Sequence, residues 1–124
     1  MLKEIVAVFI GGGIGSVLRF LLNKIEIVSE NDYPYSTFIS NVVGCFILGL
    51  VLGYFIKNDS NNSILFVFLT VGLCGGFTTF SSFSNENLQL LQNGHILSFL
   101  IYTLLSLILG IMFVYFGTIF YKNL

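Results

Sequence analysis

ILFVFLTVGLCGGFTTFSSFSNEN, residues 64–87, begins as an ordinary apolar helix and then becomes rich in glycine and hydroxyl side chains. Two adjacent glycines, Gly75 and Gly76, precede a run of β-branched and hydroxyl residues. This composition disfavours a continuous helix and predicts a membrane helix that stops and restarts. Such a break frees carbonyl groups that coordinate cations and N–H groups that attract anions. The alternative is a kinked helix whose freed backbone groups are satisfied by serine and threonine side chains.

The rest of the chain has the composition of a membrane protein. Of its 124 residues, 56% are hydrophobic and only 9% are charged, against about 25% charged residues in a soluble domain. Residues 34–56, 60–85 and 87–121 contain no Asp, Glu, Lys or Arg, and a membrane helix needs only about 20 such residues. Residues 5–22 form a fourth apolar segment, for which a signal peptide is the alternative, although no A-x-A-like cleavage site follows. We therefore predict an all-α membrane protein of four transmembrane helices, with a broken third helix, as one membrane domain over residues 1–124.

Composition also excludes several classes of function. The formal net charge is -1 and the basic residues are scattered, so no surface for a nucleic acid is expected. Enzyme chemistry is not expected, because the one histidine, His95, lies in a loop and neither cysteine has a plausible basic partner. Cys45 and Cys74 lie in apolar segments without the spacing of metal ligands, and we interpret them as small packing residues.

Small and polar residues form a stripe on the second and on the fourth predicted helix. They recur at four-residue spacing as Thr37, Asn41, Cys45, Gly49 and Gly53, and as Ser98, Tyr102, Ser106 and Gly110. Such stripes face protein rather than lipid, because small residues let helices approach closely. The Asn41 amide has two N–H donors and one acceptor, so it could donate to a passing anion or tie two helices together.

Charged side chains are rare inside the predicted spans. Arg19 shares a helical face with Gly12 and Ser16, and this small-residue face suits close helix packing. An arginine within a span marks a functional site by default, and the alternative is that its side chain snorkels to the nearby interface. Glu86 is expected near the end of its span, as a wet carboxylate at the interface.

Phe80 and Phe83 are three residues apart and share one face of the restarted helix. The edge of a phenylalanine ring is electropositive, although its face is negative. An anion could therefore pass these rings edge-on. The alternative is that both rings serve packing only.

Three motifs occur together and in this order: GGGIGSVLRF at 11–20, STFISNVVGCFILG at 36–49 and GGFTTFSSF at 75–83. They resemble the motifs of the small CrcB, or Fluc, fluoride channel family, and the resemblance covers nearly the whole chain. It implies passive fluoride export across the bacterial plasma membrane, which relieves fluoride toxicity. It also implies an antiparallel homodimer with two fluoride pathways and one structural sodium ion at the subunit interface. The choice of fluoride over chloride rests on the resemblance, because hydrogen-bond donors and ring edges attract either anion.

The resemblance also implies roles for individual residues. Sodium would be held by the backbone carbonyls of Gly75 and Thr78 from both subunits. Phe80 and Phe83 would line the pores with their ring edges, and Asn41 would donate a hydrogen bond near the pore. The other implied pathway residues are the hydroxyl residues Thr79, Ser81 and Ser82, then Arg19 at a vestibule, and Tyr102 and Ser106 on the fourth helix. The sequence departs from the family pattern at Ser36, Ser40 and Ser82, where glycine, an aliphatic residue and threonine are usual.

Two other functions remain as alternatives. A small proton-coupled multidrug exporter also uses four short helices and a dimer, but it needs a buried ionisable group. Neither Glu4 nor Glu86 is placed near a span centre. A non-transporting membrane assembly subunit would use the small-residue stripes for packing, but that function leaves the run of hydroxyl and phenylalanine residues unexplained.

The basic residues give the chain little preference for one orientation in the membrane. Four spans put both termini on one side, together with Lys3, Lys57 and Lys122, and put Arg19 and Lys24 on the other. Orientation follows the excess of Lys and Arg near span ends, and three against two is a weak bias. We therefore expect dual topology, which an antiparallel dimer requires. The alternative is a single orientation set by features other than charge.

Overall fold

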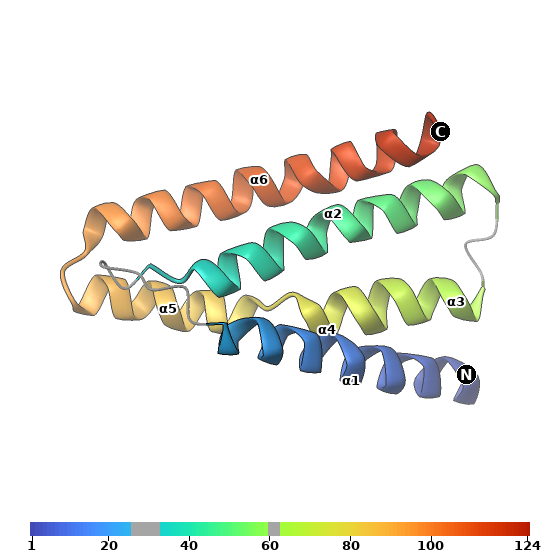
Figure 1. Ribbon diagram of the computed structural model, residues 1–124, viewed down its shortest axis with the longest axis horizontal. Coiled ribbons are helices and arrows are strands. Elements are labelled where there is room, and N and C mark those ends of the chain that lie inside the picture. The colour runs from blue at the N-terminus through green and yellow to red at the C-terminus, as the bar shows by residue number, and fades with distance from the viewer. Residues whose placement is uncertain (26–32, 60–62) are drawn as a thin grey trace.

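The structure is a computed structural model that describes residues 1–25, 33–59 and 63–124, and these residues form helices and no strands (Figure 1). Three helices are continuous, namely α1 (Leu2–Lys24), α2 (Tyr35–Lys57) and α6 (Ile96–Lys122). The third span is assembled from α3 (Ile64–Val67), the π-helix η1 (Phe68–Cys74), α4 (Gly75–Phe77) and α5 (Phe80–Gln92). In this described part of the chain, four segments are long and apolar enough to cross a membrane. The predicted all-α membrane fold with a broken third span is confirmed.

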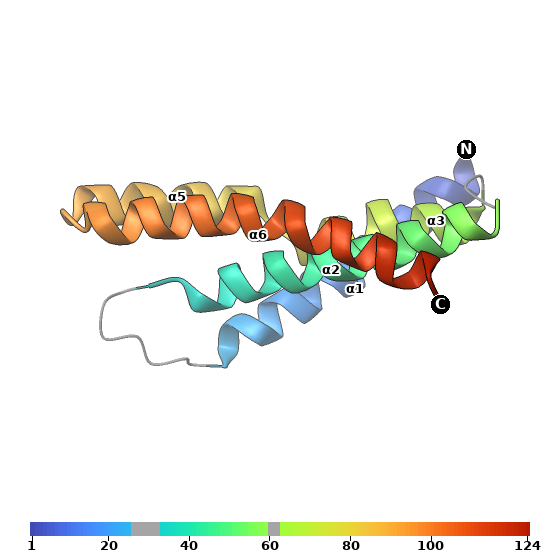
Figure 2. The same cartoon turned by 90° about the horizontal axis from the view of Figure 1, so that it is seen from above.

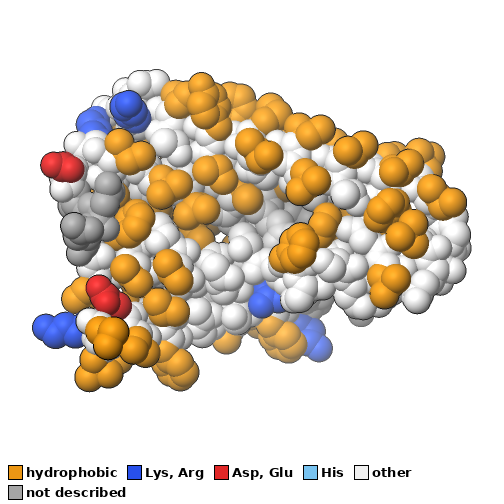
Figure 3. Space-filling model, turned by 180° about the vertical axis from the view of Figure 1, so that it is seen from behind, with side chains coloured by type: hydrophobic (Ala, Val, Ile, Leu, Met, Phe, Trp, Pro, Cys, Tyr) orange, Lys and Arg blue, Asp and Glu red, His pale blue; other side chains and the backbone are white. Residues whose placement is uncertain are grey.

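The outer surface is apolar, and polar side chains lie inside. Phe9 is 81% exposed and Ile111 is 74% exposed, and apolar side chains are spread over the whole face seen in Figure 3. By contrast, the polar side chains of Thr37 and Ser40 are fully buried. Polar groups that face the interior of a helical assembly, with apolar groups outside, are the pattern of proteins in lipid. The chain is a multi-pass membrane protein.

The connections place both chain termini at the same end of the molecule as the turn between α2 and α3 (Figure 1). The turn between α5 and α6 lies at the opposite end and contains Gly94, whose φ of 77° favours glycine. The polar segments after α2 and α5 are therefore turns where they are described. The segment after α1 falls mostly on residues 26–32, which lie outside the described residues.

The break in the third span lies at Thr78 and Thr79, both of which have extended backbone angles. The side chain of Thr79 then begins α5 as its N-cap, because its Oγ1 accepts a hydrogen bond from the Ser82 N–H at 3.2 Å. The helix thus stops and restarts as the sequence predicts. Gly75 and Gly76, which helped to predict the break, are themselves helical, and Gly76 serves another purpose.

That purpose is close packing of the third span against α1. A methyl group built on Gly11 would lie 2.6 Å from the Phe68 carbonyl oxygen, and one on Gly15 would overlap with the Leu73 carbonyl oxygen. In the other direction, a methyl group on Gly76 would overlap with the backbone of Gly12. The two backbones therefore touch directly along a glycine seam, which is how small residues drive helix association in lipid.

The π-helix η1, residues 68–74, is a feature that the sequence pattern does not predict. Within the third span it follows α3, which is a single turn of α-helix. The Thr70 hydroxyl of η1 donates to the Phe66 carbonyl oxygen of α3 at 2.7 Å. A π-helix bonds each N–H to a carbonyl five residues back, and such segments often lie near functional sites. Here η1 leads directly into α4 and the break.

On the other side of the molecule, α2 packs against the second half of α6 (Figure 1). Gly53 of α2 lies against the Thr118 carbonyl of α6, where an added methyl group would approach the oxygen to 2.6 Å. The predicted small-residue stripe of the second helix therefore faces protein. Seen from above, α5 and the first half of α6 diverge from α1 and α2 (Figure 2).

The glycine seam predicts which glycines tolerate a methyl group. Gly15→Ala and Gly76→Ala force a side chain into backbone atoms, which should lower the free energy of unfolding by about 1–3 kcal/mol. Gly13→Ala is the matched control on the same helix, because nothing lies within 4 Å of its added methyl group. That variant should keep or slightly raise stability, since alanine favours helix over glycine by up to about 1 kcal/mol. Denaturant titration in detergent micelles measures all three, and equal stabilities would show that the seam is not in contact.

Candidate functional site

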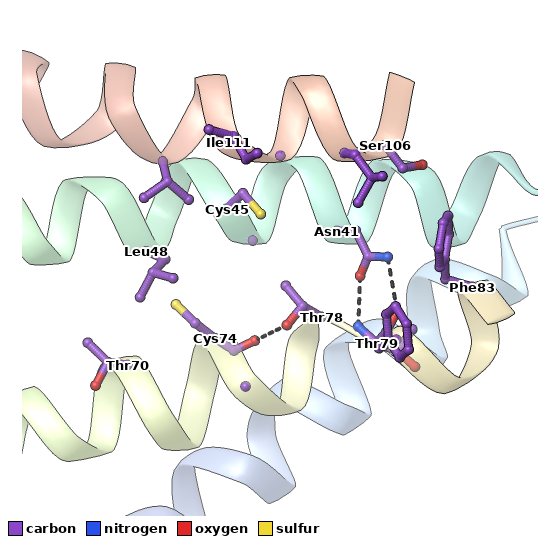
Figure 4. Close-up of a pocket in the computed structure, with 16 residues that line it drawn as sticks. Asn41, Cys45, Leu48, Thr70, Cys74, Thr78, Thr79, Phe83, Ser106 and Ile111 are labelled. Carbon is purple, nitrogen blue, oxygen red and sulfur yellow. Dashed lines mark hydrogen bonds between the residues drawn. The ribbon is translucent and has the colours of Figure 1, made fainter. Parts of the chain in front are cut away.

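An open cavity of about 460 Å³ lies between α2, α6 and the broken third span. Its polar lining gathers near the break, as Figure 4 shows for Asn41, Thr78 and Thr79. The Cys45 and Cys74 thiols lie farther along the cavity wall, and neither forms a disulfide. The predicted packing role of Cys74 agrees with its 4% exposure. The cavity wall is therefore polar next to the break and more apolar farther from it.

The Asn41 side chain ties α2 to the break by two hydrogen bonds. Its Nδ2–H donates to the Thr79 carbonyl oxygen at 3.0 Å, and the Thr79 N–H donates to Asn41 Oδ1 at 2.7 Å (Figure 4). The amide thus replaces the partners that an unbroken helix would give to Thr79. An asparagine amide has a second N–H, and Asn41 lines the cavity. Of the two predicted uses, tying helices together is observed, and donation to an anion stays a prediction.

Phe80 and Phe83 begin a ladder of aromatic rings. Their ring centroids lie 5.8 Å apart, and Phe83 lies 5.1 Å from Tyr102, which in turn lies 5.4 Å from Tyr33. Phe80 is 77% exposed whereas Phe83 is buried, and both line the cavity. Burial raises the pKa of the Tyr33 phenol, and Tyr35 raises this pKa further. The predicted shared face of the two phenylalanines is confirmed.

The hydroxyl residues at the start of α5 lie together. Thr79 Oγ1 is 3.3 Å from Ser81 Oγ and donates to Ser82 Oγ at 3.2 Å. Ser106 of α6 lines the same cavity, whereas Tyr102 is fully buried behind Phe83. The structure therefore brings Thr79 and Ser106 to the cavity, places Ser81 and Ser82 beside Thr79, and leaves Tyr102 outside the cavity lining.

The carbonyl groups before the break fall into two sets. The Cys74 carbonyl accepts bonds from the N–H and hydroxyl of Thr78, at 3.0 and 2.9 Å, and the Gly76 carbonyl accepts a bond from Arg19. No donor among the described residues reaches the carbonyls of Gly75 and Thr78. Both residues line the cavity. Backbone carbonyls without partners are ligands suited to a hard cation such as sodium, so these two residues fit the predicted sodium site.

Arg19 lies on the opposite side of the third span from the cavity. Its Nε–H donates to the Gly76 carbonyl oxygen at 3.1 Å, and the Ser16 hydroxyl lies 3.5 Å from the same oxygen. The predicted face of Gly12, Ser16 and Arg19 is therefore a packing face against α4. The guanidinium does not line the cavity.

Glu86 is placed differently from the expected wet carboxylate. It is half-buried, and its two oxygens accept hydrogen bonds from the Thr37 hydroxyl at 2.6 Å and from the Tyr102 hydroxyl at 2.7 Å. One carboxylate thus joins α2, α5 and α6. The sequence contains a partial signal, because Thr37 and Tyr102 both lie on the polar stripes that were predicted to face protein. The spacing of residues in the sequence does not show that Glu86 is the acceptor that these two hydroxyls share.

Removing either hydroxyl should destabilise the protein. Thr37→Val and Tyr102→Phe each leave one Glu86 oxygen without its donor, which costs about 1–3 kcal/mol for a buried polar group. Thr118→Val is the control, because Thr118 donates only to the Val114 carbonyl within its own helix, at 2.8 Å. Free energies of unfolding in micelles should fall in the first two variants and change little in the third. The same small change in all three would mean that the Glu86 contacts do not stabilise the fold.

Comparison with known proteins connects these features to a family. The family model described as CrcB-like protein, Camphor Resistance (CrcB), matches residues 6–118. A fluoride-specific ion channel FluC of Flavobacterium psychrophilum is 46% identical over 124 residues, which cover 99% of this chain and 100% of the relative. Proteins of the same name from Phocaeicola vulgatus and Aquifex aeolicus are 45% and 42% identical, over 94% and 95% of this chain and 96% of each relative. The chain belongs to the CrcB family.

Proposed function

We propose that this chain is a subunit of a passive fluoride channel of the bacterial plasma membrane. Relatives at 42–46% identity are named fluoride-specific ion channels, and they are not enzymes. The observation that supports this function best is the arrangement at the break, where Asn41, Thr79, Phe80 and Phe83 border one open cavity. Fluoride that enters the cell as neutral acid would leave through this pathway as the anion.

The chemistry of the cavity wall suits a small, strongly hydrated anion. Fluoride must exchange its water for other hydrogen-bond donors as it passes through the membrane. The second N–H of Asn41 and the hydroxyls of Thr79 and Ser106 are donors of that kind on the cavity wall, and the hydroxyls of Ser81 and Ser82 lie next to Thr79. The ring edges of Phe80 and Phe83 offer positive electrostatic potential without a fixed charge that would trap the ion.

The proton-coupled exporter is the rival that the structure makes worth testing, because Glu86 is more buried than expected. Such a transporter must load and release a proton at a buried acid. Both Glu86 oxygens are already occupied by hydroxyl donors from neighbouring helices. This placement favours a structural role, and the transport assay below distinguishes the two functions.

The open cavity also supports an antiparallel homodimer. In one protomer, Gly75 and the largely exposed Phe80 face outward at the break, next to the carbonyls that lack a partner. Lipid cannot satisfy such backbone groups, so another protein surface must cover them. A second copy of the chain would do so, and space exists for its close approach, since a methyl group on Gly75 would meet nothing closer than 3.8 Å. In that dimer the Gly75 and Thr78 carbonyls of both copies would hold one structural sodium ion, whose charge would stabilise the two breaks.

Ion efflux from loaded liposomes tests the function. Fluoride should leave rapidly when a potassium ionophore balances charge, and it should need no proton gradient. Fluoride and chloride electrodes are read in parallel. Chloride release at a comparable rate would refute fluoride selectivity, and a requirement for a proton gradient would refute passive conduction.

Three substitutions test the pathway. Phe80→Ile and Phe83→Ile remove the ring edge but keep an apolar side chain, and Asn41→Ala removes the amide donors. Each should lower fluoride efflux by about tenfold or more, the equivalent of about 1.4 kcal/mol. Phe9→Ile is the matched control, because Phe9 is as exposed as Phe80 but lies on α1 away from the cavity. Gel filtration checks that each variant assembles. Wild-type rates in all three would show that these residues only pack.

Labelling of a single introduced cysteine tests dual topology. With Cys45 and Cys74 replaced, a cysteine at Asn58 lies in the turn at the end that holds both termini. Reagents that cannot cross the membrane should label it from both sides, using intact cells and inverted vesicles. Labelling confined to one side would contradict dual topology, and with it the antiparallel dimer.

A further inference from the structure

The half-buried Arg19 side chain contacts the third span at one backbone atom, the carbonyl oxygen of Gly76. Gly76 is the second residue of α4, which ends at Phe77. Its carbonyl is therefore among those that lose their helical N–H partner at the end of a helix. A positive charge next to such carbonyls is favourable, because the carbonyl end of a helix is electronegative. Arg19 thus caps the C-terminal end of α4, although it belongs to α1.

The close packing along the glycine seam determines how far the Arg19 side chain lies from the Gly76 carbonyl. The Gly12 and Gly76 backbones touch, since a methyl group on Gly76 would overlap with Gly12. Arg19 lies seven residues after Gly12, on the same face of α1. At this separation its Nε meets the Gly76 oxygen at 3.1 Å. A shift of α1 along the third span would break the bond.

Holding the Gly76 carbonyl also restrains its neighbours. Gly75 lines the cavity while the Gly76 carbonyl accepts a hydrogen bond from Arg19 of α1, so these two adjacent residues face different neighbours. Peptide groups are rigid planes, so a rotation at Gly76 must be absorbed by the groups on either side. These groups include the carbonyls of Gly75 and Thr78 and, one residue later, the Thr79 backbone that binds Asn41.

We infer that Arg19 is a positioning residue, whose Nε–H holds the Gly76 carbonyl and thereby sets the direction of the backbone groups at the break. On this account its donor matters, and its charge does not recruit anions. The role differs from the vestibule role that the family resemblance implies. The inference rests on the proposed channel function for its transport readout, and it has a spectroscopic readout that does not depend on transport.

Three substitutions separate the donor from the charge. Glutamine places an amide N–H at the same number of bonds from Cα as the arginine Nε, without a charge. Lysine keeps the charge but has a methylene group at that position. Methionine has neither the N–H donor nor the charge. Lys24→Gln is the control for charge, because Lys24 lies in the last turn of α1 and, within the described part of the chain, its ammonium lies over the Phe20 ring, 5.3 Å from the centroid.

The transport readout is the fluoride efflux rate at saturating fluoride, measured at low and at high ionic strength. Arg19→Met and Arg19→Lys should lower the maximal rate by about tenfold or more, as expected when a charged hydrogen bond to a buried group is lost. Arg19→Gln should transport several times faster than Arg19→Met, and Lys24→Gln should match the wild type. None of the losses should depend on salt. The inference is overturned if Arg19→Lys keeps the rate, Arg19→Gln is as slow as Arg19→Met, and the loss disappears at high salt.

The spectroscopic readout uses the sequence itself, because Gly76–Phe77 is the only Gly-Phe pair in the chain. Glycine labelled at the carbonyl carbon and phenylalanine labelled at the amide nitrogen therefore give a single NMR correlation across this peptide bond. Its carbonyl frequency should shift in Arg19→Met, return toward the wild-type value in Arg19→Gln, and stay unchanged in Lys24→Gln. An unchanged frequency in Arg19→Met would overturn the inference, even if transport falls. Absence of fluoride efflux in the wild type would refute the channel function and leave the NMR result to decide the role of Arg19.

Discussion

The structure depends on one constraint, which is that backbone polar groups inside a membrane must have partners. The extended residues Thr78 and Thr79 interrupt the third span and remove several of those partners at once. Asn41 donates one hydrogen bond to the Thr79 carbonyl and accepts one from the Thr79 N–H, and the Thr79 hydroxyl accepts one from the Ser82 N–H. Among the described residues, no donor reaches the carbonyls of Gly75 and Thr78, and both of these residues line the cavity. A break that is satisfied on one side and open on the other is an arrangement that can hold or pass ions.

The glycine residues make this break possible by bringing a second helix to it. Because α1 touches the third span backbone to backbone, Arg19 can reach the Gly76 carbonyl. On the opposite side, Glu86 joins three helices just beyond the phenylalanine pair. The break is therefore held between two fixed supports, and its open groups lie between them. Such rigidity is what a site needs when it must distinguish anions by the positions of hydrogen-bond donors.

Much of this arrangement could be predicted from the sequence, because composition and spacing report directly on helices in lipid. Charge-free runs of sufficient length identified the spans, and the four-residue stripe on the second helix identified its protein-facing side. The break was predicted from residue types that disfavour helix. Gly75 and Gly76 contributed to that prediction although they are helical, since glycine signals both helix breaking and close packing, and sequence alone does not separate the two.

Other features could not be predicted, because they depend on contacts between residues far apart in the chain. The π-helix at residues 68–74 has no distinctive composition. Glu86 was expected to be wet because it lies near the end of its span, but Thr37 and Tyr102 reach it from two other helices. The Arg19 contact depends on the register of α1 against α4, because Gly76 lies 57 residues after Arg19 in the sequence. At these positions the local sequence is compatible with more than one structure, and tertiary packing determines which one forms.

The central claim is that the open side of the break is completed by a second copy of the chain and a sodium ion. Single-molecule photobleaching of labelled protein in bilayers, at very low protein density, measures this association directly. We expect most spots to bleach in two steps in sodium, and fewer to do so when choline replaces sodium. Single-step bleaching at every density in both solutions would contradict the account, because the unpaired carbonyls of Gly75 and Thr78 would then face lipid.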